Sequence, residues 1–285
     1  LVYEPTGALV AAPTTSLPEG LGGVRNWDYR YAWIRDSAYV LECFLRIGHA
    51  REAETFIRWL SELSERIGGA SSLRPLYRVT GEDDLTEFEL PHLEGYEGSR
   101  PVRVGNGAAH QLQLDIYGAA MQLGYLTEQV GGEVPAARWP IIRELVETVA
   151  ERWTEPDAGL WEIRSEPRHH TFSKFQCWLA VDRAIRIGRD LGLAGPYERW
   201  SAVAQEIHDS ILEHGYDREI GAFVQAYGST ALDASLLLLP LRGFLPPTDP
   251  RVRSTVEAMR EELEVADGLL LRYRTEDGLS GHEGA

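Results

Sequence analysis

The chain has 285 residues, of which 44% are hydrophobic and 25% are charged, and this balance is that of a folded globular protein rather than a disordered one. Its formal net charge of −16 argues against nucleic acid and anionic membranes as partners, because proteins that bind either present a basic surface to phosphate groups. We therefore expect a small, neutral, polar molecule as the partner.

The cysteines and the two ends of the chain bear on compartment and completeness. Cys43 and Cys177 lie among apolar residues and are predicted to be buried free thiols. No apolar run approaches the ~20 residues of a membrane span, and residues 1–7 lack the pattern of a signal peptide, so we expect a cytoplasmic protein. The chain starts without methionine and ends in Ser280–Ala285, which is typical of a piece of a larger protein. Whether it forms a homo-oligomer is an open alternative.

The first part of the chain combines an extended segment with two helices. Residues 1–24 are rich in Pro, Gly and Thr and are predicted to form an extended lead-in, and 25–285 to form one helical domain. Apolar residues at a spacing of three to four predict a helix at 33–47 and a second one over 53–63. Residues 69–105 break this pattern, and a loop of that length in a compact domain is usually functional.

Helical periodicity returns after residue 105. It predicts helices at 107–128, 139–153, 171–191, 197–213, 231–239 and 251–265. The segment 171–191 is apolar on more than one face, which predicts an inner helix, whereas 139–153 is amphipathic and is predicted to lie outside. Helical hairpins joined by alternating short and long loops predict an all-α fold of the toroid type, in which the long loops line a cleft at one end.

The standard signatures of nucleotide, metal and nucleophile chemistry are missing from the sequence. Lys174, the one lysine, does not follow a glycine-rich loop. His169 and His170 are adjacent, and neighbouring side chains diverge on a helix or a strand, so a shared metal ion is not expected. No Gly-x-Ser-x-Gly elbow is present. We expect neither a metal ion nor a cofactor.

The loops are instead rich in aromatic, arginine and carboxylate side chains. Residues 25–36 read Arg-Asn-Trp-Asp-Tyr-Arg-Tyr-Ala-Trp-Ile-Arg-Asp. Aromatic faces stack on sugar rings, and paired Arg and Asp side chains bind sugar hydroxyls. The segment is equally compatible with a helix start that is capped by Asp28 and whose aromatic residues pack into the core.

Glu162 is the candidate for acid catalysis. It lies in a loop between two predicted helices and is flanked by Trp161 and Ile163, which desolvate its carboxyl group. Desolvation raises the pKa of a carboxyl group toward the range that suits a general acid. The alternative is a surface ion pair between Glu162 and Arg164. The basic clusters 100–103 and 272–274 are also compatible with solvated turns.

Taken in order, these segments resemble glycoside hydrolase family 15, which contains glucoamylases and bacterial trehalases. The resemblance covers nearly the whole chain. It rests on Ala11–Glu19, Arg25–Asp36, Leu90–Tyr96 with Gly98–Arg103, Gln113–Gly118, Gly159–Glu162, Glu166–His169, Arg272–Tyr273 and Asp277–Leu279. It implies an (α/α)6 toroid and an inverting hydrolase that releases glucose from trehalose, maltooligosaccharides or isomaltose-type substrates. Two other functions stay open: a helical-toroid sugar epimerase that uses histidines as acid and base, and a carbohydrate-binding homologue without catalysis.

The resemblance also implies roles for single residues. Glu162 would be the general acid that protonates the glycosidic oxygen. Residues that bind or enclose the terminal glucose would be Trp33, Arg35, Asp36, Arg100, Trp161 and Arg272.

An inverting enzyme needs a second carboxylate roughly 6.5–9.5 Å from the first. The family's general base lies in a later segment and is expected beyond Ala285, so the toroid in this chain is expected to be incomplete, with its C-terminal part missing. Glu283 lies near the expected site but is not assigned as the base. Ala119 stands where many bacterial members have a glutamate, which would alter one edge of the cleft.

Overall fold

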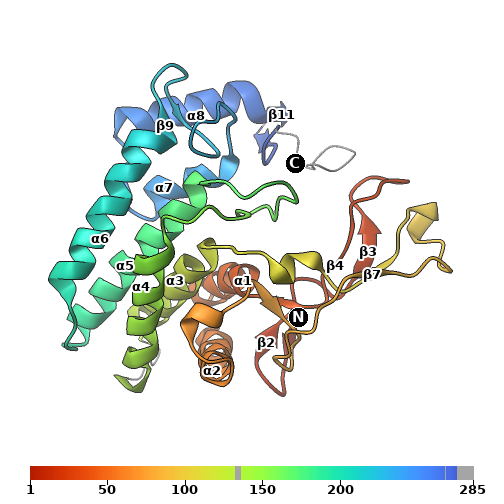
Figure 1. The fold of residues 1–285 in the computed structure, drawn as a ribbon, viewed down its shortest axis with the longest axis horizontal. Helices are drawn as coiled ribbons and strands as arrows, with labels where there is room; N and C mark the ends of the chain where they lie inside the picture. The colour runs from red at the N-terminus through yellow and green to blue at the C-terminus, as the bar shows by residue number, and fades with distance from the viewer. Residues whose placement is uncertain (132–135, 267, 275–285) are drawn as a thin grey trace.

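The computed structural model describes residues 1–131, 136–266 and 268–274, and within these ranges it contains eight α-helices. They are α1 (Ile34–Arg46), α2 (Ala50–Arg66), α3 (Asp115–Gln129), α4 (Trp139–Arg152), α5 (Thr171–Asp190), α6 (Tyr197–Ser210), α7 (Leu238–Leu241) and α8 (Pro250–Leu263). In Figure 1, α8 lies at the top with α7 beneath it, α6, α5 and α4 lie on the left, α3 and α1 lie near the centre, and α2 lies at the bottom. The predicted all-α fold is confirmed.

Short antiparallel strand pairs join the helices. In the described residues, β1 (Val2–Tyr3) pairs with β2 (Ala8–Leu9), β3 (Thr15–Pro18) with β4 (Asn26–Asp28), β5 (Ala32–Trp33) with β6 (Leu76–Tyr77), β7 (Phe88–Glu89) with β8 (Arg103–Val104), β9 (Tyr216–Asp217) with β10 (Ala222–Phe223), and β11 (Glu264–Ala266) with β12 (Leu269–Leu270). Within residues 1–24, the β1–β2 turn places Ala8 and Leu9 in the core, where both are fully buried. The strand β2 of the lead-in segment is therefore packed against α2.

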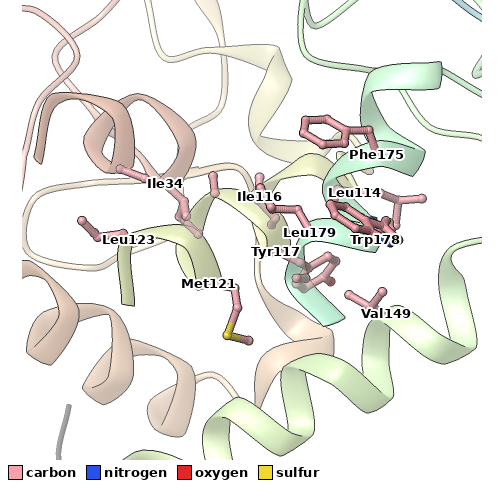
Figure 2. Packing of buried hydrophobic residues seen from close by; sticks show 14 of the residues in the cluster. Ile34, Leu114, Ile116, Tyr117, Met121, Leu123, Val149, Phe175, Trp178 and Leu179 are labelled. Carbon is pink, nitrogen blue, oxygen red and sulfur yellow. Dashed lines mark hydrogen bonds between the residues drawn. The ribbon is translucent and has the colours of Figure 1, made fainter. Parts of the chain in front are cut away.

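The helices form hairpins with an inner and an outer member. The inner helices α1, α3 and α5 lie side by side, and the outer helices α2, α4 and α6 pack against them. Burial follows this order, since sixteen of the twenty residues of α5 are buried but six of the fourteen in α4. The predictions of an inner helix at 171–191 and an outer one at 139–153 are confirmed. Figure 2 shows Ile34 of α1, Ile116 and Tyr117 of α3 and Leu179 of α5 in one apolar cluster.

Two predicted helices have different boundaries in the structure. The helix predicted at 107–128 begins at Asp115, after a 3-10 turn η3 (Gly107–His110) and an extended stretch. The N–H of Leu114 donates to the Asp157 carboxylate at 3.0 Å instead of to the preceding turn, and the helix starts at Asp115, eight residues after the predicted start. The segment predicted at 231–239 is a 3-10 turn η6 (Ala234–Leu237) that leads into the four-residue α7.

Buried polar side chains join distant parts of the chain. Arg242, which follows α7, donates to Glu42 of α1 at 2.8 Å, and both side chains are about nine-tenths buried. Burial alone would raise the pKa of Glu42, but the hydrogen bonds from Arg242 and Arg46 outweigh it and lower the pKa. Lys174 of α5 is 1% exposed, and its Nζ donates to the carbonyl oxygen of Trp153 at the end of α4 at 2.6 Å.

Two further findings bear on the expectations from sequence. Cys177 is buried as predicted, but the prediction for Cys43 is wrong, because its side chain lies on the exposed side of α1. Among the helices of the described ranges, none combines the length and the apolar character that crossing a lipid bilayer requires.

The contact between α3 and α5 depends on Gly118. A Cβ atom at this position would lie 2.4 Å from the carbonyl oxygen and 2.8 Å from the Cα of Gln176. These are backbone atoms, so a side chain at 118 forces the two inner helices apart. Gly124, one and a half turns later on α3, faces open space.

We expect Gly118→Ala to lower the free energy of unfolding of the full-length protein by about 1–3 kcal/mol, the usual cost of overpacking. Gly124→Ala is the matched control and should raise it by up to about 1 kcal/mol, because alanine favours the helix. Urea denaturation followed by circular dichroism measures both. A Gly118→Ala protein as stable as the parent would show that the two helices can separate at no cost.

Candidate active site

A cavity of about 580 Å³ lies where the long loops meet. Its walls come from segments 25–39, 106–108, 160–164 and 234–238, together with Glu19 and Arg272. This size is within the range of pockets that bind small molecules. Of the side chains predicted to contact or act on glucose, the cavity is lined by Trp33, Arg35, Asp36, Trp161, Glu162 and Arg272.

Glu162 lies in a tight turn whose backbone is held by another segment. Its φ angle is +57°, in the left-handed region that non-glycine residues rarely adopt. The side-chain amide of Gln111 donates to the carbonyl oxygens of Glu162 at 3.2 Å and Ile163 at 3.3 Å. At Gly159, where the turn begins, a Cβ atom would lie 2.8 Å from the His170 ring. The unusual backbone of Glu162 is thus fixed by contacts from outside its own loop.

The two oxygens of the Glu162 carboxyl group have different surroundings. Oε1 accepts hydrogen bonds from Trp33 Nε1 at 2.7 Å, Arg35 Nη2 at 3.1 Å and Gln113 Nε2 at 3.2 Å. Across the described ranges, no hydrogen bond to Oε2 is formed. Because three donors already surround Oε1, a proton on this carboxyl group sits on Oε2. The side chain is 21% exposed and lines the cavity, so a ligand there can reach it.

The surroundings of Glu162 favour its protonated form. Burial raises its pKa, Arg35 lowers it, and the nearby charge of Asp36 raises it, with a net rise above the ordinary value. A raised pKa is what general-acid catalysis near neutral pH needs. The alternative surface pair with Arg164 is not formed, because Arg164 binds both oxygens of Glu87 at 3.1 and 2.7 Å.

Arg35 is a buried cation that connects three acceptors. Its Nη1 donates to Gln113 Oε1 at 2.8 Å and to Asp115 Oδ2 at 2.9 Å, while Nη2 donates to Glu162. Burial would lower the pKa of Arg35, but Asp115, Asp36 and Glu162 outweigh it and raise the pKa, so the side chain stays charged. The structure therefore places Arg35 as one of the three groups that hold Glu162, and its predicted contact with glucose stays a prediction.

The other residues predicted to bind glucose differ in whether they line the cavity. Asp36 is 43% exposed at the cavity, with its Oδ2 3.7 Å from Arg35 Nε. Arg272 lies over the Trp161 ring, with Cζ 5.4 Å from the ring centre. Arg100 is exposed in the β7–β8 connection and is not among the residues that line the cavity, so its predicted role is untested.

Two sequence expectations concern residues away from the cavity walls. Glu283 lies outside the described residues. Ala119 is buried on α3 beside Tyr39 and Glu42 in a smaller void, and it does not line the main cavity. Ala119 is therefore not part of the described walls of the cavity.

The chain is similar to known proteins over its whole length. The model of "Glycosyl hydrolases family 15" matches residues 1–285. The trehalase of Mycobacterium tuberculosis is 50% identical over 292 residues, covering 100% of this chain and 42% of that protein. The trehalase of Thermoplasma acidophilum is 45% identical over 285 residues, covering 100% of this chain and 48% of that protein. The chain thus spans a little less than half the length of the curated relatives it matches.

A solved structure supports the toroid. A bacterial glucoamylase complexed with acarbose superposes with a TM-score of 0.69 at 15% identity, covering 94% of this chain and 39% of that one. Identity this low shows a common fold and nothing of the substrate. The predicted α/α toroid is confirmed.

Removing one donor to Oε1 should raise the pKa of Glu162. Trp33→Phe deletes the 2.7 Å hydrogen bond, which stabilises the carboxylate more than the acid, so we expect a rise of about one pH unit. Titration of the Glu162 carboxyl carbon by NMR in the full-length protein measures this. Trp27→Phe is the control, because Trp27 also lines the cavity but contacts Arg103 and Arg164. An unchanged Glu162 pKa in Trp33→Phe would contradict the assigned hydrogen bond.

Proposed function

Since the chain belongs to glycosyl hydrolases family 15, we propose that it is the acid-bearing part of a glycosidase that hydrolyses trehalose with inversion of configuration. The observation that carries the proposal is Glu162: a carboxyl group of raised pKa, held through one oxygen by three donors at the wall of a cavity. The cavity is large enough for a disaccharide, and its aromatic walls suit the C–H faces of sugar rings.

In the proposed reaction, Oε2 of Glu162 gives its proton to the glycosidic oxygen as the bond from C1 to that oxygen breaks. Glu162 becomes a carboxylate, and the hydrogen bonds from Trp33, Arg35 and Gln113 strengthen as its charge grows. Interactions that strengthen in the transition state raise the rate of the chemical step.

The second half of the reaction supplies the hydroxyl group. Water attacks C1 from the face opposite the leaving oxygen, and a second carboxylate takes its proton. That general base, predicted beyond Ala285, stays a prediction. Asp36 and Arg272 are proposed to bind the glucose hydroxyls, with Trp33 and Trp161 as the apolar walls.

The choice among substrates and functions rests on specific observations. Trehalose is favoured over maltooligosaccharides and isomaltose because relatives at 50% and 45% identity are called trehalases. A sugar epimerase that works through histidines has less support, because none of the described residues lining the cavity is a histidine. A cytoplasmic location and the oligomeric state stay predictions.

The first test replaces the acid. In the full-length protein, Glu162→Gln should lower kcat for trehalose by about 10²–10⁴-fold, the usual share of general-acid catalysis, while calorimetry shows that trehalose still binds. Glu166→Gln is the matched control, because Glu166 is exposed in the same loop and should leave kcat unchanged. Turnover by Glu162→Gln within tenfold of the parent would remove Glu162 from the role of acid.

The second test reads substrate and stereochemistry together. Assayed side by side, trehalose should have a higher kcat/KM than maltose and isomaltose. Inversion at one C1 of α,α-trehalose yields a β-glucose, while the leaving glucose keeps its α configuration. Early NMR spectra should therefore show α- and β-glucose in equal amounts. Early spectra with α-glucose alone would indicate retention, and faster hydrolysis of maltose would overturn the choice of trehalose.

A further inference from the structure

Asp233 connects the cap of one turn with the wall of the cavity. It is the N-cap of η6, where its Oδ1 accepts hydrogen bonds from Ser235 N at 2.9 Å and Ser235 Oγ at 2.6 Å. Its Oδ2 accepts from Trp161 Nε1 at 2.8 Å and from Gln225 Nε2 at 3.4 Å. The residue is 3% exposed. One buried carboxylate thus holds both the turn η6 and the indole that lines the cavity.

The backbone around Asp233 holds the other half of the same wall. Asp233 forms an antiparallel bridge with Tyr273, and Ala234 N donates to the carbonyl oxygen of Arg272 at 3.0 Å. The Tyr273 ring lies 5.8 Å from the Trp161 ring, and Arg272 Cζ lies 5.4 Å from it. Trp161 is therefore anchored at its N–H by the Asp233 side chain and covered by two residues that pair with the 233–234 backbone.

We propose that Asp233 is a positioning residue that fixes the Trp161 indole and the Arg272 segment as one rigid wall of the saccharide site. This inference rests on the proposed function, because it takes a sugar to be the ligand that contacts this wall. The hydrogen bond at its N–H restrains rotation of the indole about its side-chain bonds, so the part of the ring that lines the cavity is held in place. A wall that contacts the sugar equally before and during bond cleavage affects KM rather than kcat.

The test compares two N-cap aspartates. In Asp233→Asn the side chain keeps one oxygen for the cap, but its NH2 group meets the Trp161 N–H donor with another donor. We expect KM for trehalose to rise about tenfold and kcat to stay within threefold in the full-length protein. Asp249→Asn is the matched control: Asp249 caps α8 in the same way and binds Arg251, away from the cavity, so KM should stay unchanged. Unchanged KM in Asp233→Asn would overturn the proposal.

A double-mutant cycle separates positioning from general destabilisation. In a Trp161→Phe background the N–H donor is gone, so adding Asp233→Asn should raise KM less than threefold further. The full tenfold rise in that background would overturn the proposal, because Asp233 would then act without Trp161.

NMR of the indole N–H protons needs no catalysis and tests the anchor directly. The Trp161 signal, assigned by its loss in Trp161→Phe, should exchange with water more slowly than the signals of exposed indoles. It should move upfield in Asp233→Asn and stay in place in Asp249→Asn. If Asp233→Asn does not fold, the exchange rate in the parent protein decides, and exchange as fast as that of a free indole would overturn the proposal. If the parent hydrolyses no disaccharide, the proposed function fails while this measurement still decides the anchor.

Discussion

The buried charge of Arg35 is the constraint on which the arrangement of the site depends. A guanidinium removed from water is tolerated when its donors are paired, and Arg35 is paired with Asp115, Gln113 and Glu162. Arg35 lies in the first turn of α1, and Asp115 lies in the first turn of α3. Their ion pair therefore holds the starts of these two inner helices next to each other. Asp157 extends this connection, because its Oδ2 accepts from Leu114 N at 3.0 Å and from Ser173 Oγ of α5 at 2.7 Å. The beginnings of all three inner helices thus meet beneath the loop that carries the acid.

Regular apolar spacing explains why most helices could be predicted, and its limits explain what could not. The spacing places α1, α2, α4, α5, α6 and α8 within a few residues of their ends, because each buries one or more apolar stripes. It fails at residues 107–114, where Ala109 and Leu112 continue the apolar spacing of the next helix although the backbone there is not α-helical. On a helix, Gln111 and Gln113 would face different ways, whereas in an extended backbone residues two apart lie on the same side, and both side chains reach Glu162. A hydrogen bond to Asp157, 43 residues away in sequence, decides between the two conformations.

The sequence predicts the site residues that belong to one local motif. It does not predict a residue whose role depends on a partner far away along the chain. Glu162 and Trp161 are adjacent in sequence, and the desolvating effect of the neighbours of Glu162 can be read there. Asp233 has the ordinary position of an N-cap, and nothing in its neighbourhood indicates that its second oxygen binds an indole 72 residues earlier. The family resemblance assigned glucose contacts to Arg35 but could not show that its guanidinium is already engaged with three protein acceptors.

Lys174 has a consequence for the chemistry of the surface. It is the one lysine among 28 basic residues, and it is buried with its Nζ against the carbonyl oxygen of Trp153. Glucose in its open-chain form is an aldehyde, and aldehydes condense with accessible amines to form Schiff bases. Within these 285 residues, every other basic side chain apart from histidine is a guanidinium. Because Lys174 is buried, these 285 residues expose no lysine side chain that could form a Schiff base with an aldehyde sugar.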